Sequence, residues 1–385
     1  MKIVFFTRGF PSENDIMAGN YEAVQAKALA AKGCQVSVIT NQELSRHHLL
    51  DVGRIRHRKV DGVDVYEGTS LSFSKRFIRR INRYTRRWSY SRLFKRCINE
   101  HGMPDVLHGH IVSTSSFTIF LKEKYHLPYI ITEHWSKTFV SESPKWLRQM
   151  ASAYYKADKV ICVSQALAYA LKQNFSVRSI VINNMVNDKF FQSVKKTRND
   201  KLFRFIACGA FRKDRNKGFD ILVDAFAKAQ FPGNVHLDIV GDGEDRPFVE
   251  DKIAEYGLSG QIHLLGVKTP DEVSDLLCRS DCFVLSSRLE TFAIVVIEAM
   301  AKGLPVIATR CGGPETFLQP EHGLLVEKEN VEQLSDAMKY MIWHNSDYDS
   351  DSIRKFCHSN FSQDIIADKI IEVYNNVIND KKVKA

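Results

Sequence analysis

Short apolar runs rich in β-branched residues alternate with helical patterns along the whole chain. In the first half these runs lie at 3–6, 36–39, 106–108, 129–132 and 160–163. Such an alternation is typical of βαβ units. It predicts a parallel sheet that is covered by helices on both faces.

A second series of apolar runs begins after residue 200, at 203–208, 235–240, 262–265, 282–285 and 305–308. The polar segment 191–201 has no periodicity and reads as a linker. We therefore predict two doubly wound domains, over 1–190 and 202–360. A helical tail over 361–385 is expected to pack back on the first domain. Because open α/β sheets bind ligands at the carboxyl ends of their strands, both sheets should face one central crevice.

Composition places the chain among soluble globular enzymes. It has 385 residues, of which 44% are hydrophobic and 26% charged, and this excludes disordered and fibrous proteins. No run of apolar residues is long enough for a signal peptide or a membrane span. The eight cysteines are scattered without a CxxC pair, which favours a reducing cytoplasm over a disulfide framework or a zinc site.

The net charge of +9 comes from one segment, because 75–96 holds ten cations and no acid. Phe77, Ile81, Tyr84 and Trp88 recur there at helical spacing, so the segment is predicted to be a basic amphipathic helix. Two interpretations stay open. The stripe packs in the core below solvated arginines, or the helix meets anionic phospholipid or a pyrophosphate-bearing acceptor. A nucleic-acid partner is not expected, since the rest of the chain is not basic. The candidate membrane-facing residues are Arg79, Arg80, Arg83, Arg86, Arg87 and Trp88.

The strongest candidate for chemistry is the segment 286–308. A strand there ends in a polar turn with Glu290, and a short helix through Glu298 to Gly303 follows. We interpret 294–297 as helix in spite of its β-branched residues, because no turn separates it from Glu298. The N-terminus of this helix, near Thr291, suits a phosphate group. At the helical rise the two glutamates would lie about 12 Å apart.

The surrounding motifs resemble the donor-binding half of glycosyltransferase family 4, whose members are retaining enzymes of the GT-B architecture. They lie in order at 209–220 (GAFRKDRNKGFD), 240–243 (VGDG), 265–267 (LGV), 290–298, 312–315 (GGPE) and 323–326 (GLLV). The resemblance implies two Rossmann-like domains, of which the first binds the acceptor and the second binds a nucleotide sugar.

The same resemblance implies a role for individual residues. Lys217 becomes a cation on the donor diphosphate, Glu298 a ligand of the ribose hydroxyls, and Glu290 a ligand of the transferred sugar. The arginine of the family usually follows the strand glycine directly, where this chain has Ala210. We therefore assign it to Arg212, with Arg215 as second candidate. The other expected donor-binding residues are Thr291, Phe292, Ala293, Gly241, Gly266 and Val267.

In the first half, Gly19 and Asn20 open a helix and resemble the acceptor-side loop of the family, although members often have two glycines there. His134 follows a strand at the position where the family places a histidine near the sugar, so we assign it to sugar binding. His108 and His110 form an HxH pair without a third ligand in sequence reach, and no metal is expected there. The segment 183–187 (NNMVN) resembles the family's Pro-Asn-Gly-Val-Asp segment.

The implied function is transfer of a sugar, of hexosyltransferase type, from a nucleoside diphosphate sugar to a saccharide or lipid-linked acceptor. The anomeric configuration is expected to be retained. We expect no cofactor and no metal, a role in bacterial surface polysaccharide or glycolipid synthesis, and a location in the cytoplasm or on the inner face of the plasma membrane. Two alternatives stay open: a GT-B epimerase or phosphorylase, and a non-catalytic membrane-binding protein. The sequence does not specify the donor base or the sugar.

Overall fold

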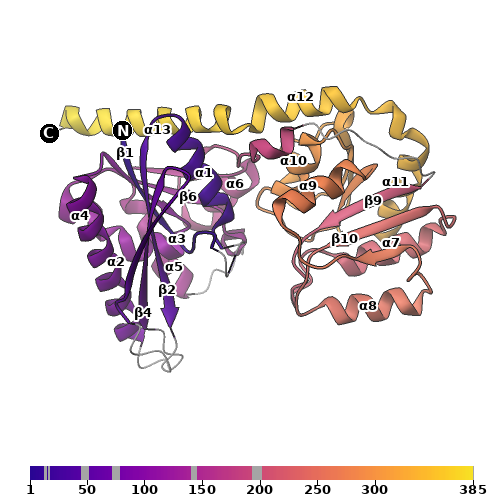
Figure 1. Cartoon of the computed structure of the whole chain (residues 1–385), viewed down its shortest axis with the longest axis horizontal. Helices are drawn as coiled ribbons and strands as arrows, with labels where there is room; N and C mark the ends of the chain where they lie inside the picture. Colours follow the sequence, from indigo (N-terminus) through magenta and orange to yellow (C-terminus); the bar gives the residue numbers. More distant parts are fainter. Residues whose placement is uncertain are drawn as a thin grey trace. The chain divides into compact units, whose positions relative to one another are not determined.

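The computed structural model describes residues 1–12, 15, 18–44, 52–71, 79–139, 145–192 and 202–384. The chain forms two compact units. Unit 1 comprises Met1–Met185 together with Gln363–Ala385, and unit 2 comprises Val186–Ser362. Figure 1 shows both units.

Unit 1 contains an eight-stranded sheet in the order β3-β4-β2-β1-β5-β6-β7-β8. All neighbours pair in parallel except β3 and β4, which are antiparallel. The five predicted apolar runs of the first half are strands β1, β2, β5, β6 and β7, which confirms the parallel sheet. The bounds are β1 Lys2–Thr7, β2 Gln35–Leu44, β3 Ile55–Val60, β4 Val63–Leu71, β5 Val106–His110, β6 Tyr129–Glu133, β7 Lys159–Cys162 and β8 Ile180–Val181.

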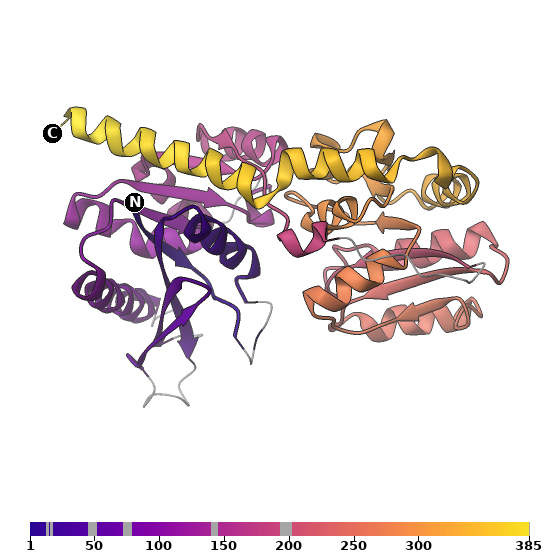
Figure 2. The ribbon, with the colours of Figure 1, turned by 45° about the horizontal axis from the view of Figure 1, so that its top comes forward.

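The helices of unit 1 include the C-terminal helix α13, which spans Gln363–Lys384. Ile366, Ile370 and Tyr374 repeat at helical spacing and join the core formed by α1 and the strands. Both views show α13 alongside α1 (Figures 1 and 2). The remaining helices are α1 Asn20–Ala31, α2 Arg79–His101, α3 Val112–Thr118, α4 Phe120–Tyr125, α5 Lys145–Lys156 and α6 Gln165–Phe175.

Unit 2 contains a six-stranded, fully parallel sheet in the order β11-β10-β9-β12-β13-β14. The five apolar runs of the second series are its strands β9 to β13. The bounds are β9 Phe203–Cys208, β10 Val235–Val240, β11 Ile262–Leu264, β12 Cys282–Leu285, β13 Val306–Thr309 and β14 Gly323–Val326. The architecture of each unit is therefore the doubly wound one that the alternation predicts.

Helices cover both faces of the unit 2 sheet. One core cluster joins the strands to α7, α8 and α11, and Figure 1 shows α9 and α10 on the opposite side of β9 and β10 from α7 and α8. The segment 294–297 is helical, as predicted, because α10 runs from Ile294 to Ala301. The bounds of the others are α7 Phe219–Ala229, α8 Arg246–Glu255, α9 Pro270–Cys278, α11 Val331–His344 and α12 Ser350–Phe361.

The boundary between the units lies at Met185 and Ser362. A short 3₁₀ helix at Asp188–Phe191 belongs to unit 2, where Lys189 pairs with Asp271 at 3.0 Å. Most of the predicted linker, from 193 to 201, lies outside the described residues. Among the described residues, no helix is both long and apolar enough to cross a membrane.

Candidate functional site

The loops after β9 and β12 bring a cation and a carboxylate together in unit 2. The Lys217 Nζ donates to Glu290 Oε1 at 2.7 Å, and the Ser287 hydroxyl donates to the same oxygen at 2.8 Å. Only 12% of the Glu290 side chain and 22% of the Lys217 side chain are exposed. Among the described residues, the second carboxylate oxygen of Glu290 has no hydrogen-bond partner. It is therefore available to a ligand.

Backbone contacts hold these two loops against each other. The Asn216 side-chain amide donates to the Leu289 carbonyl at 2.8 Å, and the Ser286 hydroxyl donates to the Lys217 carbonyl at 2.9 Å. Gly218 has a φ of 63°, and a Cβ there would lie 2.0 Å from the Ser286 carbonyl oxygen. Only glycine fits this approach. The Lys217 side chain is thereby placed by the fold of the loop.

The turn between Glu290 and α10 is fixed by the segment that follows β13. Glu290 N–H donates to the Cys311 carbonyl at 2.8 Å, and a Cβ on Gly313 would lie 2.5 Å from the backbone of Phe292. Ala293 precedes the helix with a φ of 72°, and no side chain caps the helix N-terminus. Val296 N–H donates to the Ala293 carbonyl at 3.0 Å. The N–H groups of Ile294 and Val295, together with the positive end of the helix dipole, are the ones that suit an anion.

Two expectations about this helix were wrong in detail. The helix begins at Ile294, three residues later than Thr291, because Ala293 is in the left-handed conformation. The helical rise therefore does not apply between Glu290 and Ile294. The predicted distance of about 12 Å between Glu290 and Glu298, which assumed that rise, does not hold. The helix also ends at Ala301, before Gly303.

Glu298 lies in the second turn of α10 among largely buried neighbours. Val296, Ile297, Ala299 and Met300 are all fully buried. Among the described residues, none makes a hydrogen bond or ion pair with the Glu298 carboxyl. Burial raises the pKa of this carboxyl to about 8, because the charged form is poorly solvated there. Glu298 is therefore a carboxyl poised to ionise when a hydrogen-bond donor arrives.

The loops after β10 and β11 present backbone rather than side chains. Gly241 N–H donates to the Gly266 carbonyl at 2.9 Å, and Gly241 has a φ of 136°, with a Cβ there reaching 1.9 Å from the Gly209 carbonyl oxygen. Val267 is 60% exposed. That these loops contact the base of the donor stays a prediction.

The two candidate arginines lie differently. Arg212 is 65% exposed and pairs with Asp214 at 3.3 Å, without contacting Lys217 or Glu290. The Arg215 Nε contacts Asp245 at 3.1 Å, and its guanidinium lies 3.5 Å from the centre of the Phe248 ring. Arg212 is thus the more easily redirected, because an exposed ion pair is weak. Its assignment stays a prediction.

A partly buried ion pair that sequence reasoning missed supports the Glu290 turn. Arg288 donates to both oxygens of Asp220, at 3.0 and 2.9 Å, and to the Arg215 carbonyl. Burial raises the pKa of Asp220, but the hydrogen bonds and charge of Arg288 outweigh it and hold that pKa below the usual value. An arginine two positions before Glu290 was the available signal, although its partner is 68 residues away in the chain.

In unit 1, His134 follows β6 as expected and is held by a buried carboxylate. The backbone N–H groups of His134 and Trp135 donate to Glu133 Oε1 at 3.0 and 2.8 Å, and the Tyr154 hydroxyl donates to Glu133 Oε2. Burial lowers the pKa of His134 to about 4. The imidazole is therefore neutral near pH 7 and suits hydrogen bonds to hydroxyl groups.

The HxH pair is brought next to His134 by the fold. His110 Nδ1 lies 3.2 Å from His134 Nε2. His108 is fully buried, with both ring nitrogens engaged by the hydroxyls of Tyr374 and Thr132 at 2.6 and 2.7 Å. Its ring therefore anchors α13 to β5 and β6, and it has no nitrogen left for a metal.

Gly19 and Asn20 stand where the acceptor-side loop was expected. Gly19 caps α1 with a φ of 63°, and a Cβ there would lie 2.1 Å from the Gly9 carbonyl oxygen. Asn20 is the first residue of α1. The loop after β1 is thus packed tightly on the start of this helix.

The basic helix exists as α2, but its stripe does not lie in the core. Ile81, Tyr84 and Trp88 are 51%, 72% and 41% exposed. The buried face is a different one, formed by Tyr90, Leu93, Phe94 and Cys97. The interpretation with a core-facing stripe is therefore wrong, because the tertiary contacts rotate this stripe outward.

Not all of the predicted surface cations are available on α2. The Arg86 guanidinium lies 4.2 Å from the Phe117 ring centre and pairs with Glu43, and Arg87 lies 4.4 Å from the Phe120 ring centre. Arg86 and Arg87 thus contact the protein, which corrects their assignment to a membrane surface. Arg83 is exposed. Phe77 and the side chains of Arg79 and Arg80 lie outside the described residues.

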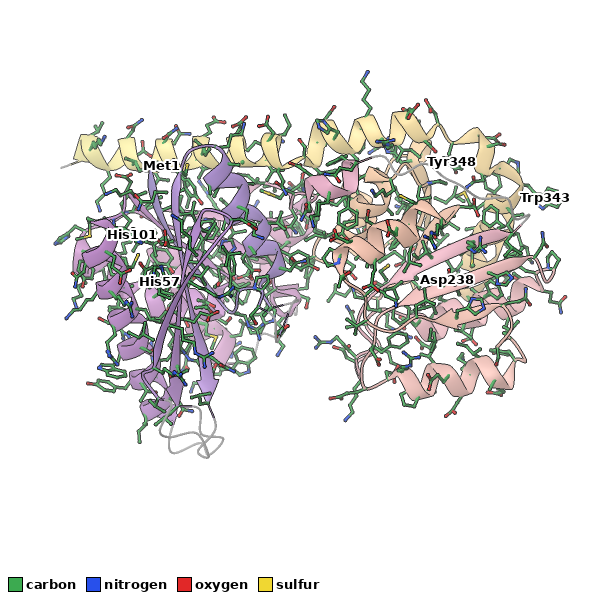
Figure 3. The ribbon with its side chains drawn as sticks, viewed as in Figure 1. Met1, His57, His101, Asp238, Trp343 and Tyr348 are labelled. Atoms are coloured by element: carbon green, nitrogen blue, oxygen red, sulfur yellow. The ribbon has the colours of Figure 1, made fainter. Side chains whose placement is uncertain are left out.

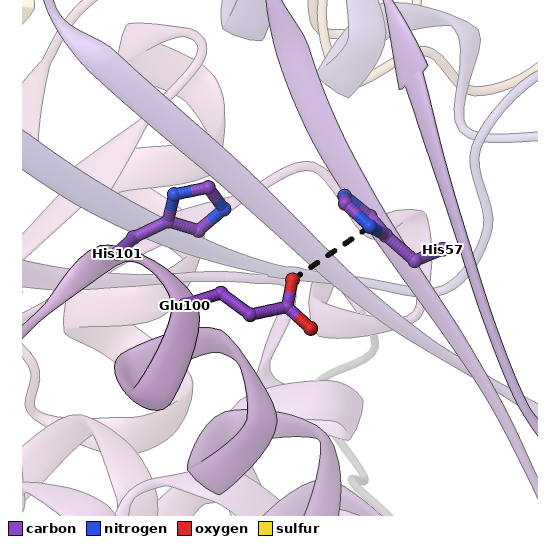
Figure 4. Close-up of side chains that lie close together, drawn as sticks. All are labelled: His57, Glu100 and His101. Atoms are coloured by element: carbon purple, nitrogen blue, oxygen red, sulfur yellow. Dashed lines mark ion pairs between the residues drawn. The ribbon is translucent and has the colours of Figure 1, made fainter.

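One group in the part of the chain that the structure describes could hold a metal ion. His57, Glu100 and His101 offer ligand atoms within 4.8 Å of one another (Figure 4), and both histidines lie in unit 1 (Figure 3). His57 Nε2 already contacts Asp64 at 3.0 Å, and Glu100 accepts hydrogen bonds from Tyr66 and Arg96. His57 and Glu100 are therefore engaged in a polar tie between the end of α2 and the strands β3 and β4. Among the described residues, His101 Nε2 has no hydrogen-bond partner and lies 3.6 Å from Asp64.

Comparison with known proteins identifies the chain. The model of glycosyl transferases group 1 matches residues 188–355, and that of Glycosyltransferase Family 4 matches residues 19–190. An uncharacterized glycosyltransferase of Methanocaldococcus jannaschii is 34% identical over 252 residues, covering 64% of this chain and 68% of the relative. The chain is a glycosyltransferase of the family 4 type. The resemblance found in the sequence is confirmed.

Further relatives and solved structures of this glycosyltransferase agree with that family and with its fold. A lipopolysaccharide core biosynthesis glycosyltransferase of Rhizobium meliloti is 35% identical over 131 residues, which covers 34% of this chain and 37% of the relative. Sucrose-phosphate synthase of Thermosynechococcus elongatus superposes with a TM-score of 0.81 at 20% identity, covering 98% and 99% of the two chains. The HepE protein of Anabaena, solved in complex with UDP, gives 0.73 at 17% identity, covering 98% and 100%. These structures show the GT-B fold.

Proposed function

We propose that the enzyme transfers a sugar from a nucleoside diphosphate sugar to a saccharide or lipid-linked acceptor, with retention at the anomeric carbon. The observation that carries the proposal is the contact of Lys217 with Glu290 beside the uncapped N-terminus of α10. Two sources of positive charge and one carboxylate thereby meet at the carboxyl ends of β9 and β12. A diphosphate joined to a sugar presents the complementary groups.

The roles follow from charge. A nucleoside diphosphate gains negative charge as the glycosidic bond breaks, and fixed positive groups stabilise that change. Lys217 and the first turn of α10 supply them. Glu290 keeps one oxygen for a hydroxyl of the sugar, and Glu298 accepts from the ribose hydroxyls. Arg212 stays our candidate for a second cation.

Retention is proposed from the resemblance to glycosyltransferase family 4, whose members are retaining enzymes. Among the described residues, the side chains bonded to Glu290 are Lys217 and Ser287. Glu290 therefore has no carboxyl group as a hydrogen-bond partner, and we assign no second carboxylate for a double displacement. We propose instead that the departing phosphate oxygen takes the proton of the acceptor on the same face of the sugar.

The donor is identified by a thermal-stability screen with UDP, GDP, ADP and their sugars. A ligand at 100 times its dissociation constant stabilises the folded state by about 2.7 kcal/mol. We expect one nucleoside diphosphate to raise the melting temperature clearly, and its sugar then to be transferred. The HepE structure with UDP makes UDP the first ligand to try. Failure of all three families to bind would contradict the proposal, and a product with inverted anomeric configuration in proton NMR would contradict retention.

We also propose that the outer face of α2 binds anionic membranes and brings the enzyme to a lipid-linked acceptor of surface polysaccharide or glycolipid synthesis. Exposed Ile81, Tyr84 and Trp88 lie beside exposed Arg83. Aromatic side chains suit the headgroup region, and each cation near an anionic surface contributes about 1 kcal/mol before screening. The name of the Rhizobium relative supports such a pathway.

A further inference from the structure

A pocket of about 480 Å³ lies at the carboxyl ends of β1, β2 and β4 in unit 1. This volume is within the range of small-molecule sites. Arg8, which follows β1, lines it together with Arg54 and Arg56, which come from the start of β3. β3 runs antiparallel to β4, so its first residues reach the same edge of the sheet as the ends of the parallel strands.

The arginines of β3 stand in a row. Arg54, Arg56 and Arg58 alternate with other residues, and alternate positions of a strand face the same side, roughly 7 Å apart. Arg56 pairs directly opposite Glu67 of β4. Three guanidinium groups are thus directed to one face, and Glu67 is the carboxylate across from them.

That carboxylate is already engaged. Arg58 donates to Glu67 Oε1 at 3.0 Å and to the Pro11 carbonyl at 2.7 Å. Arg8 and Arg56 are exposed and make no hydrogen bond or ion pair with any described residue. Among the described residues that line the pocket, the acids are Glu67 and Asp15 and the cations are Arg8, Arg54 and Arg56. The pocket therefore carries an excess of positive charge.

We propose that this pocket binds a phosphate or diphosphate group of the acceptor. The inference rests on the proposed function, since it specifies the substrate class of the acceptor side. Each guanidinium presents five donors in a planar fork that matches phosphate oxygens. A carboxylate has only two oxygens, which one guanidinium saturates. The three arginines that line the pocket, Arg8, Arg54 and Arg56, fit a group with more oxygens and more negative charge than a carboxylate.

The remaining lining suits the part of the acceptor next to that phosphate. Thr40, Gln42 and Thr69 contribute hydroxyl and amide groups. They offer both donors and acceptors, as hydroxylated sugars require. A phosphate on the arginines would thereby orient the adjoining sugar at the carboxyl edge of the sheet.

The test is calorimetric titration of inorganic pyrophosphate into the enzyme at low salt. The protein is first saturated with the nucleoside diphosphate identified by the donor screen, so that the diphosphate site of unit 2 is occupied. We expect wild-type enzyme to bind pyrophosphate, Arg56→Gln to bind it at least tenfold more weakly, and Arg56→Lys to fall between. Lys59→Gln is the matched control, because it removes one charge from the opposite side of the same strand.

Equal pyrophosphate affinity in wild type and Arg56→Gln would overturn the inference, as would no binding by the wild type. If glucuronate binds more tightly than pyrophosphate and its binding depends on Arg56, the inference is also overturned, because the pocket then recognises a carboxylate rather than a phosphate. Farnesyl diphosphate and glucose 1-phosphate, titrated in the same way, distinguish a lipid-linked from a soluble phosphate. If pyrophosphate binds through Arg56 but no nucleotide binds at all, the proposed function fails while the anion site stands.

Discussion

Binding of the nucleoside diphosphate is predicted to release a proton from Glu298. Burial raises the pKa of this carboxyl to about 8, so at pH 7 about nine in ten molecules carry it protonated. Hydrogen bonds from the ribose hydroxyls favour the ionised form. In the complex its pKa should therefore fall toward the ordinary range.

The size of the effect follows from that shift. If the pKa falls from about 8 to about 5, binding at pH 7 releases roughly 0.9 proton. The affinity of wild-type enzyme then rises with pH, by roughly 50-fold between pH 6 and 8, and levels off above pH 8. The ligand phosphate titrates too, but it does so equally in a Glu298→Gln variant, which serves as the control.

The assay is calorimetry of nucleoside diphosphate binding at pH 7 in Pipes and in Tris, whose ionisation enthalpies differ. The difference in observed enthalpy gives the number of protons released. We expect wild type to release close to one proton more than Glu298→Gln. Equal release by both proteins, or a wild-type affinity that gains nothing over the variant between pH 6 and 8, would refute the reasoning.

The same carboxyl predicts a pH-dependent stability. Its folded pKa lies above the value of 4.5 for a free glutamate, so the folded state holds a proton that the unfolded state releases between those two values. Stability from this group is complete below about pH 4.5 and is lost as pH rises through about 8. Glu298→Gln should thus be more stable than wild type at pH 9, by on the order of 5 kcal/mol, and similar at pH 4.5. Urea midpoints at both pH values measure this.

Four further predictions concern the other groups. Glu290→Gln should lower turnover yet leave nucleoside diphosphate affinity equal or higher, because Lys217 loses its partner at 2.7 Å; calorimetry that shows weaker binding would contradict the assignment. Lys217→Gln should weaken nucleoside diphosphate binding by roughly 10- to 100-fold, because one charge-assisted hydrogen bond is lost. Excess EDTA should leave the turnover of wild-type enzyme unchanged in a rate assay. Tyr84→Ala with Arg83→Gln should release the enzyme from anionic liposomes in sedimentation, whereas Trp343→Ala, which removes an aromatic that is 82% exposed in unit 2, should not.

The sequence determined the order of most elements and named the candidate residues of the site in unit 2. Alternating apolar runs place ten of the parallel strands, because strand and helix periodicity are local properties. The runs did not include the parallel strands β4, β8 and β14. The helix over 294–297 also follows locally, since no turn precedes Glu298. Lys217, Glu290 and Glu298 were named as candidates from the resemblance of their motifs to glycosyltransferase family 4.

The tertiary structure decided which side chains meet and which faces are open. Lys217 and Glu290 are 73 residues apart in the chain, and only the pairing of β9 with β12 brings their loops together. The stripe of α2 follows helical periodicity, but the direction of its faces depends on what packs against the helix. In the sequence, Arg56 is one cation among many. The pairing of β3 with β4 places it opposite Glu67, whose Oε1 already accepts a hydrogen bond from Arg58. Periodicity describes each element alone, whereas charge balance and burial arise only between elements that the fold makes neighbours.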